Sequence, residues 1–532
     1  MKKQQKGIIL LVVFGGSLLF WATAASLPGI TPEDPNEKIT VTETPMDNYP
    51  DVQRVQFCSS SEFAKSNSYV TEYKIPTACT QPLAIVTDPD GNVWFAQTNT
   101  GKLGKFNPVT ETFVEYENPK WPQGGRSMMW GIDYSPDGSI WFTDEANDSL
   151  WKFSIQDENY ERTQFPRVLE SLPQRLSVEG SKIIVNDFTG NKLTFLDPTK
   201  TGEGTAYLSI PSPVEGSVTG GFGVDADDNV WYTNWIFQTG GVLVKLNQSK
   251  IFEQSNLLAE NVTALFDVLD IYQFPLGMTT PNGVSADSEG KIWIVDTSSS
   301  FFFKFDPDTE SYTKYITSIP HESSYGNSSG LIKTPISRPY WSEFDDKGRL
   351  VFNEQTANRI GVFDPIKESL VEYSVPSKNP NWADCEAMEN CGLAQVFDLA
   401  VDGDTIWFTE WVENNIGKID SSKPLPFNVD LDKEKIILKT GEQAQLRLQL
   451  SPNNEINFGN AEIISANTAT FSDIQIQADT KSISQEELAN PITILITISA
   501  SENAIPDIHK VLVGAQTDDV TVSKYLTVII ER

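Results

Sequence analysis

The fold is decided by residues 137–144, which read Asp-Gly-Ser-Ile-Trp-Phe-Thr-Asp. This phrase combines a tight turn, a short apolar strand centred on tryptophan, and a polar residue where the strand ends. Copies of it recur at residues 90–97, 228–234, 290–296 and 404–410, and weaker copies without tryptophan occur at 183–187 and 348–354. Short strand phrases that recur at roughly 40–60 residues predict a propeller or a solenoid.

Each repeat contains three further strand patterns, so the repeating unit is a sheet of four short strands. The seventh repeat stops after its third strand, at residues 417–419, and the missing strand lies before the first repeat. There, residues 70–76 closely match residues 371–376. Because a ring abolishes unpaired sheet edges, we expect the N-terminal strand to complete the last sheet. The predicted fold is all-β, with a seven-bladed β-propeller over residues 69–424 that is closed by this strand.

A second domain follows residue 424, because the tryptophan phrase does not occur beyond it. Residues 443–450 and 492–498 alternate between side chains for two faces, as strands with one buried face do. Their length and spacing suit an immunoglobulin-like β-sandwich, which we expect over residues 425–532.

The first 25 residues form a targeting segment. Lys2, Lys3 and Lys6 precede an uncharged run over residues 7–25, which is long for a signal peptide and just long enough to span a bilayer. A cleaved signal peptide and an N-terminal membrane anchor, a transmembrane helix, therefore both fit. Either one exports the rest of the chain, to the extracellular face of the cell membrane or as a secreted protein. Residues 26–68 are rich in proline and acids and are interpreted as a linker.

Export makes the four cysteines candidates for disulfides. Cys385 and Cys391 are close enough to close a small loop, and Cys58 and Cys79 would then pair, but the sequence leaves three connectivities open. Structural disulfides fit better than redox chemistry, because no Cys-x-x-Cys occurs. The formal net charge is -32, from 72 acidic and 40 basic residues, so the surface repels phosphate and nucleic acid is not an expected partner.

The predicted binding surface is the top face, our name for the side of the propeller where second strands end and the next blades begin. Polar strand ends and aromatic residues gather there, as in a site for a small molecule, a glycan or a protein. The linker over residues 26–68, which we call the tether, and the C-terminal domain are expected on the other face, which leaves the top face free. The predicted ligand-binding residues are Trp130, Asn186, Asn234, Asn282, Tyr340 and Trp341.

Acidic residues at second-strand ends suggest a metal site. Oxygen ligands from several blades suit Mg or Ca, and the candidate ligands are Glu145, Asp296, Glu354 and Glu410. A plainer interpretation competes for every strand-end residue, because such side chains often hydrogen-bond a neighbouring turn. The repeated tryptophans are expected to pack in the core between blades rather than to stack on a ligand.

Residues 69–424 resemble the streptogramin (virginiamycin B) lyase family of seven-bladed propellers. The resemblance is carried by paired phrases such as Ile-Trp-Phe-Thr-Glu at 406–410 followed by Asn-Ile-Gly-Lys-Ile at 415–419. It implies a carbon-oxygen lyase that opens a cyclic depsipeptide by elimination at an ester, with Mg held by glutamates and a catalytic histidine. His321 is the candidate catalytic residue, although it lies in an insertion rather than at a strand end. The other histidine, His509, lies in the C-terminal domain and is expected at its surface.

Three functions are compatible with these patterns. The leading hypothesis is an exported ligand-binding, partner-binding or scaffold propeller, because no histidine occupies the position expected for a catalytic base. The first alternative is a Mg-dependent carbon-oxygen lyase of the virginiamycin B lyase type that opens cyclic esters. The second is a metal-dependent lactone hydrolase, because residues 281–284 resemble the metal-binding asparagine phrase of gluconolactonase-like propellers.

Overall fold

The computed structural model describes residues 54, 56–121, 127–164, 171–180, 182–197, 207–237, 239–253, 268–328, 335–386, 388–453, 456–470 and 472–532. The predicted signal peptide or anchor at residues 1–25 and most of the linker at 26–68 lie outside these ranges. Among the described residues, no helix combines the length and the apolar character needed to cross a membrane. Strands dominate the structure, which confirms the all-β prediction.

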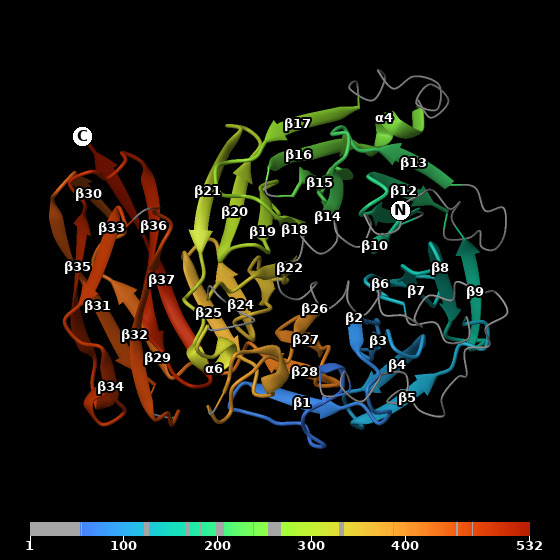
Figure 1. Cartoon of the computed structure of the whole chain (residues 1–532), viewed down its shortest axis with the longest axis horizontal. Coiled ribbons are helices and arrows are strands. Elements are labelled where there is room, and N and C mark those ends of the chain that lie inside the picture. The colour runs from blue at the N-terminus through green and yellow to red at the C-terminus, as the bar shows by residue number, and fades with distance from the viewer. Residues whose placement is uncertain are drawn as a thin grey trace.

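Seven sheets of four antiparallel strands follow one another along the described chain and stand around a common centre (Figure 1). We number them sheets one to seven. Sheets one to three consist of β2 (Pro82–Thr87), β3 (Val93–Gln97), β4 (Lys102–Asn107), β5 (Thr112–Tyr116), β6 (Ile132–Ser135), β7 (Ser139–Asp144), β8 (Ser149–Ser154), β9 (Asn159–Gln164), β10 (Pro173–Glu179), β11 (Lys182–Asp187), β12 (Lys192–Leu196) and β13 (Tyr207–Pro211).

Sheets four and five consist of β14 (Val218–Val224), β15 (Asn229–Ile236), β16 (Gly240–Asn247), β17 (Leu269–Gln273), β18 (Pro281–Ala286), β19 (Ile292–Asp296), β20 (Phe301–Asp306) and β21 (Ser311–Ile316). Sheets six and seven consist of β22 (Pro339–Phe344), β23 (Leu350–Glu354), β24 (Arg359–Asp364), β25 (Ser369–Ser374), β26 (Val396–Asp402), β27 (Thr405–Glu410), β28 (Asn415–Asp420) and β1 (Val70–Lys74). Helices in the described residues are short and include α4 (Gln248–Glu253) and α6 (Glu322–Tyr325).

The seven sheets close into a ring. The first strand of each sheet contacts the first strand of the next, and β26 of sheet seven contacts β2 of sheet one. The first strands are therefore innermost, which is the arrangement of a β-propeller (Figure 1).

The tryptophan phrase builds the second strand of its sheet and buries the indole ring. All five tryptophans of the phrase are almost completely buried. In three sheets the indole N–H donates to an aspartate six residues earlier, in the pairs Trp94–Asp88 at 2.8 Å, Trp231–Asp225 at 2.7 Å and Trp293–Asp287 at 2.9 Å. A buried indole N–H needs such a partner, so the turn and the strand are fixed together. The core role predicted for these tryptophans is confirmed.

The strand β1 supplies the fourth strand of sheet seven. It pairs antiparallel with β28, from Val70 opposite Ile419 to Lys74 opposite Asn415. The predicted pairing of the N-terminal strand with the last repeat is thus confirmed. The strand β1, which comes from the start of the propeller sequence, covers the outer edge of β28. The strand β28 therefore has no open edge where the ring closes.

Two further sheets follow sheet seven. One contains β29 (Phe427–Leu431), β31 (Gln443–Pro452), β35 (Ile492–Ala500) and β33 (Ile474–Ala478), and the other contains β30 (Lys435–Lys439), β32 (Asn460–Asn467), β34 (Ser482–Ser484), β36 (Ile508–Gln516) and β37 (Val520–Glu531). The long strand β37 also pairs antiparallel with β25, from Ser369 opposite Lys524 to Tyr373 opposite Val520. Sheet six and the second C-terminal sheet are therefore one continuous nine-stranded sheet.

The C-terminal domain lies beside the ring, against the outer strand of sheet six (left in Figure 1). The expectation that tether and C-terminal domain share the face opposite the top face is wrong. The C-terminal domain lies elsewhere because β25 offers a free edge, and β37 pairs with it. The tether leaves that face because Ser66 pairs with Thr71, so the chain before β1 runs back along this strand to the top face.

The four cysteines form the two disulfides Cys58–Cys79 and Cys385–Cys391, one of the three connectivities that the sequence allows. The first ties the tether to the chain that follows β1. The second closes the insertion between β25 and β26. This insertion also pairs with the insertion between β21 and β22, because Gly326 forms a β-bridge with Asp384.

Candidate binding site at the ring axis

The innermost strands are irregular near their first residues. Among the described residues, six of the seven first strands shift register against the second strand at this point. Such a β-bulge re-aims side chains and is common beside functional sites. The residues at these bulges include Gln174 and Arg175 in sheet three, Asn282 in sheet five, Tyr340 and Trp341 in sheet six, and Phe397 and Asp398 in sheet seven.

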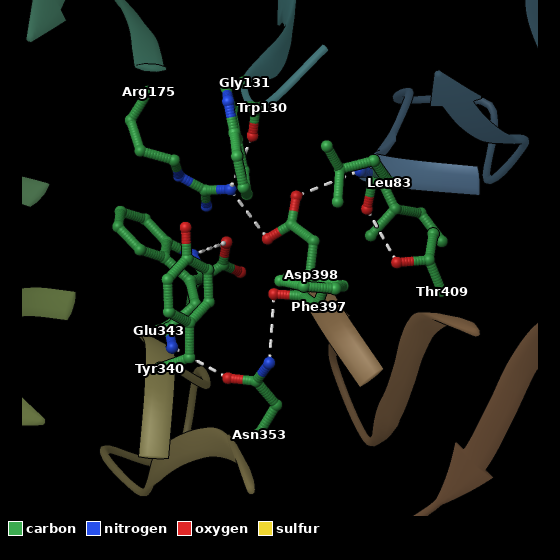
Figure 2. A network of polar contacts seen from close by, with 12 residues as sticks. Leu83, Trp130, Gly131, Arg175, Tyr340, Glu343, Asn353, Phe397, Asp398 and Thr409 are labelled. Atoms are coloured by element: carbon green, nitrogen blue, oxygen red, sulfur yellow. Dashed lines mark hydrogen bonds and ion pairs between the residues drawn. The ribbon is translucent and has the colours of Figure 1, made fainter. Parts of the chain in front are cut away.

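Arg175 of sheet three reaches across the centre of the ring to Asp398 of sheet seven (Figure 2). Its Nη1 lies 2.8 Å from Oδ1 of Asp398 and donates to the carbonyl oxygen of Trp130 at 3.3 Å. The guanidinium also stacks on the indole of Trp341, with 3.3 Å between Cζ and the ring centroid. The two charged side chains are only 11% and 4% exposed. This buried ion pair fixes the position of the guanidinium at the axis.

Two carboxyl groups on the other side of the axis have raised pKa values. Asp398 accepts a hydrogen bond from the Ile85 backbone at 3.0 Å, and burial raises its pKa although Arg175 lowers it. Glu343 of β22 lies 3.4 Å from Nε1 of Trp341. Burial, and then the charge of Asp398, raise the pKa of Glu343 to about 7. The axis therefore holds one carboxyl group that changes charge near neutral pH.

An aromatic cap covers this polar centre on the top face. We use this name for the residues Phe57, Trp130, Tyr340, Trp382, Phe397 and Trp411, each at most 5% exposed. Their rings meet edge to face, with centroid distances of 5.3 to 6.0 Å. Phe57 belongs to the tether, and the neighbouring carbonyl of Gln56 accepts a hydrogen bond from Trp382 at 2.5 Å. The predicted free top face is thus partly covered by the chain itself.

Four of the six predicted ligand-binding residues come together at the axis. Trp130 and Tyr340 lie near Arg175 (Figure 2). Trp341 stacks on the guanidinium, and Asn282 lies beside Trp341, because a Cβ added at Gly221 would meet both of them. The side-chain oxygen Oδ1 of Asn282 is buried and has no hydrogen-bond partner in the described part of the chain. An unpaired buried acceptor costs about 1–3 kcal/mol, so this oxygen is a candidate ligand contact.

Asn186 and Asn234 are engaged in hydrogen bonds of the ring itself instead, one between sheets and one within a sheet. Nδ2 of Asn186 donates to the carbonyls of Thr219 and Gly220 in the next sheet, and Asn234 donates to Val218 in its own sheet. Threonines at the ends of other second strands make the same contact with the first strand of the next sheet, in the pairs Thr143–Gln174, Thr233–Pro281, Thr297–Pro339 and Thr409–Leu83. These contacts agree with the interpretation that strand-end side chains hydrogen-bond neighbouring parts of the chain rather than a ligand.

The four predicted metal ligands lie in four different sheets and have separate partners. Glu145 accepts from Trp130 at 2.7 Å, Asp296 from Thr280 at 2.6 Å, Glu354 from Arg359 at 2.9 Å and Glu410 from Asn415 at 2.8 Å. Burial raises the pKa of Glu145 to about 8. No three His, Cys, Asp or Glu side chains of the described residues form a group that could hold a metal ion. These residues do not fit one shared Mg or Ca site, and metal binding by them stays a prediction.

The two histidines lie away from the axis. His321 is exposed and caps α6, because its Nδ1 accepts a hydrogen bond from the Ser323 backbone at 3.2 Å. It therefore has a local structural contact and none with the axial residues. His509, expected at the surface, is 6% exposed, because it belongs to β36, which packs against β21 of sheet five. Burial lowers the pKa of His509.

Sequence reasoning does not find Arg175, Asp398 or Glu343. They belong to first strands, and the repeated phrase marks only second strands. A signal is nevertheless present, because Arg175 and Asp398 occupy the same place in their sheets as Trp341, which the sequence does single out. Alignment of the first strands across the repeats would bring the three residues together.

Comparison with known proteins supports the fold. No family model matches the chain, and no curated protein matches its sequence. The structure of virginiamycin B lyase from Staphylococcus aureus is 18% identical, with a TM-score of 0.50, and the match covers 66% of this chain and 98% of that chain. A streptogramin B lyase structure is 19% identical, with a TM-score of 0.50 and coverage of 66% and 96%. At these identities the likeness shows a shared fold, and the resemblance seen in the sequence is confirmed at that level.

Proposed function

We propose that the chain is an exported, seven-bladed β-propeller with an immunoglobulin-like C-terminal sandwich, and that it binds a carboxylate-bearing ligand or partner at its top face. Each numbered sheet serves as one blade, and the pairing of β37 with β25 fixes the sandwich to blade six. The two disulfides support export, because such bonds persist in oxidising compartments.

The arrangement of Arg175 carries this proposal. Its Nη1 is used by Asp398 and Trp130, whereas its Nε and Nη2 donate to no residue that the structure describes. Trp341 holds the plane of the guanidinium, so these two donors have a fixed direction. A preorganised guanidinium fork is suited to two parallel hydrogen bonds with a carboxylate. The unpaired oxygen of Asn282 supplies an acceptor for a donor group on the same ligand.

Binding can be tested with the exported protein on arrays of acidic glycans and acidic peptides. Arg175→Lys keeps the positive charge but loses the fork, so we expect the array signal to fall. Arg349→Lys is the matched control, because Arg349 also forms an ion pair, at 2.5 Å from Asp345, but at the opposite end of a second strand. Equal signals for the two variants, or no signal for the unmodified protein on either array, would contradict the proposal.

A second candidate function is a carbon-oxygen lyase that opens cyclic esters. One observation favours it: Glu343 at the axis has a pKa raised to about 7, and a general base works best when its pKa is near the operating pH. In such a reaction the Glu343 carboxylate would take a proton from the carbon next to the one that bears the ester oxygen. A carbon–carbon double bond would form between these two carbons, and the bond from the second carbon to the ester oxygen would break to leave a carboxylate.

The lyase can be tested with a streptogramin B-type lactone, with added Mg and with a chelator. Elimination leaves the product at the mass of the substrate, whereas hydrolysis by a lactone hydrolase adds one water, so mass spectrometry separates the two alternatives. We expect Glu343→Gln to abolish elimination and His321→Ala to leave it unchanged. An unaltered lactone under all conditions would remove both enzymatic alternatives for this substrate.

A further inference from the structure

The insertion between β21 and β22 and the insertion between β25 and β26 are fastened to each other, and we call their contact the junction. The backbone N–H of Gly392 donates to the carbonyl oxygen of Ser323 at 3.0 Å. The backbone N–H of Asp384 donates to the carbonyl oxygen of Tyr325 at 3.2 Å. The Cys385–Cys391 disulfide closes the second insertion. Side chains at the junction are therefore held in fixed positions relative to one another.

Three polar side chains meet at the junction. Oγ of Ser323 lies 2.9 Å from Nδ1 of His321 and accepts a hydrogen bond from Nζ of Lys378 at 2.7 Å. Ser323 and His321 belong to the first insertion and Lys378 to the second. The hydroxyl of Ser323 thus has two nitrogen atoms within hydrogen-bond distance. A serine hydroxyl that contacts a basic nitrogen is the arrangement of an activated nucleophile.

The helix cap explains only part of this arrangement. Nδ1 of His321 also accepts from the Ser323 backbone at 3.2 Å, so these two residues lie together because they begin α6. The cap does not require Lys378, which comes from the other insertion and reaches the same hydroxyl. Ser323 is half-buried and His321 is exposed, so a small molecule in solution has access to the hydroxyl.

The surroundings of Lys378 favour its neutral form. This half-buried lysine forms no ion pair within the described residues, although the chain carries a net charge of -32. Burial, and then the charge of Lys65, lower the pKa of Lys378 to about 8, and the charge of Asp518 opposes this shift. A lysine with such a pKa can accept a proton near neutral pH, which an ordinary surface lysine cannot do.

We propose that Ser323 is a nucleophile, that Lys378 is its general base, and that the junction cleaves small esters. The neutral amine of Lys378 takes the hydroxyl proton while Oγ of Ser323 bonds to the carbonyl carbon of the ester. The ester C–O bond breaks, and Lys378 gives the proton to the leaving alcohol. A water molecule then attacks the acyl-serine by the same proton transfer, which releases the acid and restores both side chains.

His321 acts in this reaction as a positioning residue, because its contact with the Ser323 backbone fixes the place of the nucleophile. The junction is separate from the ring axis, since His321 has no contact with the axial residues. Ester cleavage at the junction is therefore independent of ligand binding at Arg175, and either can fail without the other.

The pH dependence follows from the form of Lys378 that acts. Only the neutral amine takes the proton, so reactivity rises as the pH increases to about 8 and levels off above this value. A serine without a base reacts only through its alkoxide, whose population keeps rising by about tenfold for each pH unit in this range. The shape of the profile therefore distinguishes the two cases.

A fluorophosphonate probe tests for the nucleophile in the full-length protein, with the labelled residue identified by mass spectrometry. We expect Ser323 to be labelled at a rate that levels off above about pH 8, and p-nitrophenyl acetate to be cleaved with the same profile. Ser323→Ala should abolish both, whereas the control Ser324→Ala, in the same turn of α6, should change neither. An unlabelled Ser323, or equal ester cleavage by Ser323→Ala and the unmodified protein, would overturn the proposal.

Substitution of the lysine tests the base separately. Lys378→Arg keeps a positive charge and a hydrogen-bond donor but cannot accept a proton, so labelling of Ser323 should fall by about 100-fold or more. Lys378→Ala should show the same loss, and added ethylamine should restore part of the rate, because it supplies a neutral amine. Unchanged labelling of Ser323 in Lys378→Arg would show that the lysine is not the base.

Two charges near Lys378 allow its pKa to be moved in opposite directions. Lys65→Gln removes a positive neighbour and should shift the levelling of the rate to higher pH. Asp518→Asn removes a negative neighbour and should shift it to lower pH. If the profile levels off at the same pH in both variants and in the unmodified protein, the titration of Lys378 does not govern the reaction and the proposal fails.

Discussion

The hydroxyl of Thr409 in sheet seven donates to the carbonyl oxygen of Leu83 in sheet one at 2.6 Å, across the seam where the ring closes (Figure 2). The same kind of contact joins other neighbouring sheets, for example Thr233 with Pro281 at 2.8 Å. Two features therefore stabilise the seam, the strand β1 on the outside and this hydrogen bond near the axis. Substitutions can weaken each of them separately.

Replacement of Thr409 by valine keeps the shape of the side chain and removes the donor. We expect the free energy of unfolding to fall by about 1–3 kcal/mol, because the buried Leu83 carbonyl loses its partner. Chemical denaturation measures this loss. Thr313→Val in the outer strand β21 is the control and should change stability by less than about 0.5 kcal/mol. A loss no greater than that of the control would show that the Thr409–Leu83 hydrogen bond does not stabilise the seam.

Asp398→Ala should destabilise the protein by about 3–5 kcal/mol, because it leaves the buried Arg175 guanidinium without the carboxylate that it contacts. The double variant Arg175→Met with Asp398→Leu removes both charges and should recover most of the loss. Thermal and chemical unfolding of the two variants provide the measurement. If the double variant were less stable than Asp398→Ala, the pair would not be coupled in the way that its 2.8 Å separation indicates.

Glu343 should make stability depend on pH in the neutral range. Its pKa is raised to about 7 in the folded protein, so its contribution to stability is complete below its ordinary pKa of 4.5 and is lost as the pH rises to about 7. Glu343→Gln has no carboxyl group to ionise and lacks this loss, so the stability of the variant relative to the unmodified protein should rise as the pH increases through this range. Denaturant unfolding at several pH values checks the difference, and parallel curves would contradict it.

The two disulfides should differ in their effects. Removal of Cys58–Cys79, which spans 21 residues, should cost about 3 kcal/mol, whereas removal of Cys385–Cys391, which spans 6, should cost about 2 kcal/mol. Paired Cys→Ser substitutions and thermal unfolding give both values. Only the first should also raise the exposure of Trp382 and Trp411 to a fluorescence quencher, because it releases Phe57. Equal quenching in the two variants would argue against a role of the tether in the cap.

The sheets and the seam of the ring could be predicted because their signals are local or repeated. The turn and strand around Trp94 lie within a few residues of Asp88, so one phrase specifies both. The strand β1 resembles the fourth strands of other repeats, and a ring needs it in one place only. Physical rules on edges and turns were sufficient for these elements.

The axial site and the position of the C-terminal domain could not be predicted in the same way. Arg175 and Asp398 are far apart in the sequence, and neither lies in a repeated phrase, so their ion pair depends on the ring geometry. The pairing of β37 with β25 depends on which of several similar outer strands accepts a partner. The strand-end carboxylates carried a clear pattern, but their hydrogen bonds in the folded chain serve neighbouring turns and strands.

The pairing of β37 with β25 also makes the order of synthesis matter. The ring can close as soon as β28 has been made, because β1 is already present by then. Its sixth sheet nevertheless keeps an open row of backbone donors and acceptors until residues 520–524 emerge from the ribosome. A chain cut short before residue 520 displays this row to chaperones, proteases and other copies of itself. Only a chain that has been translated to its last strand hides it.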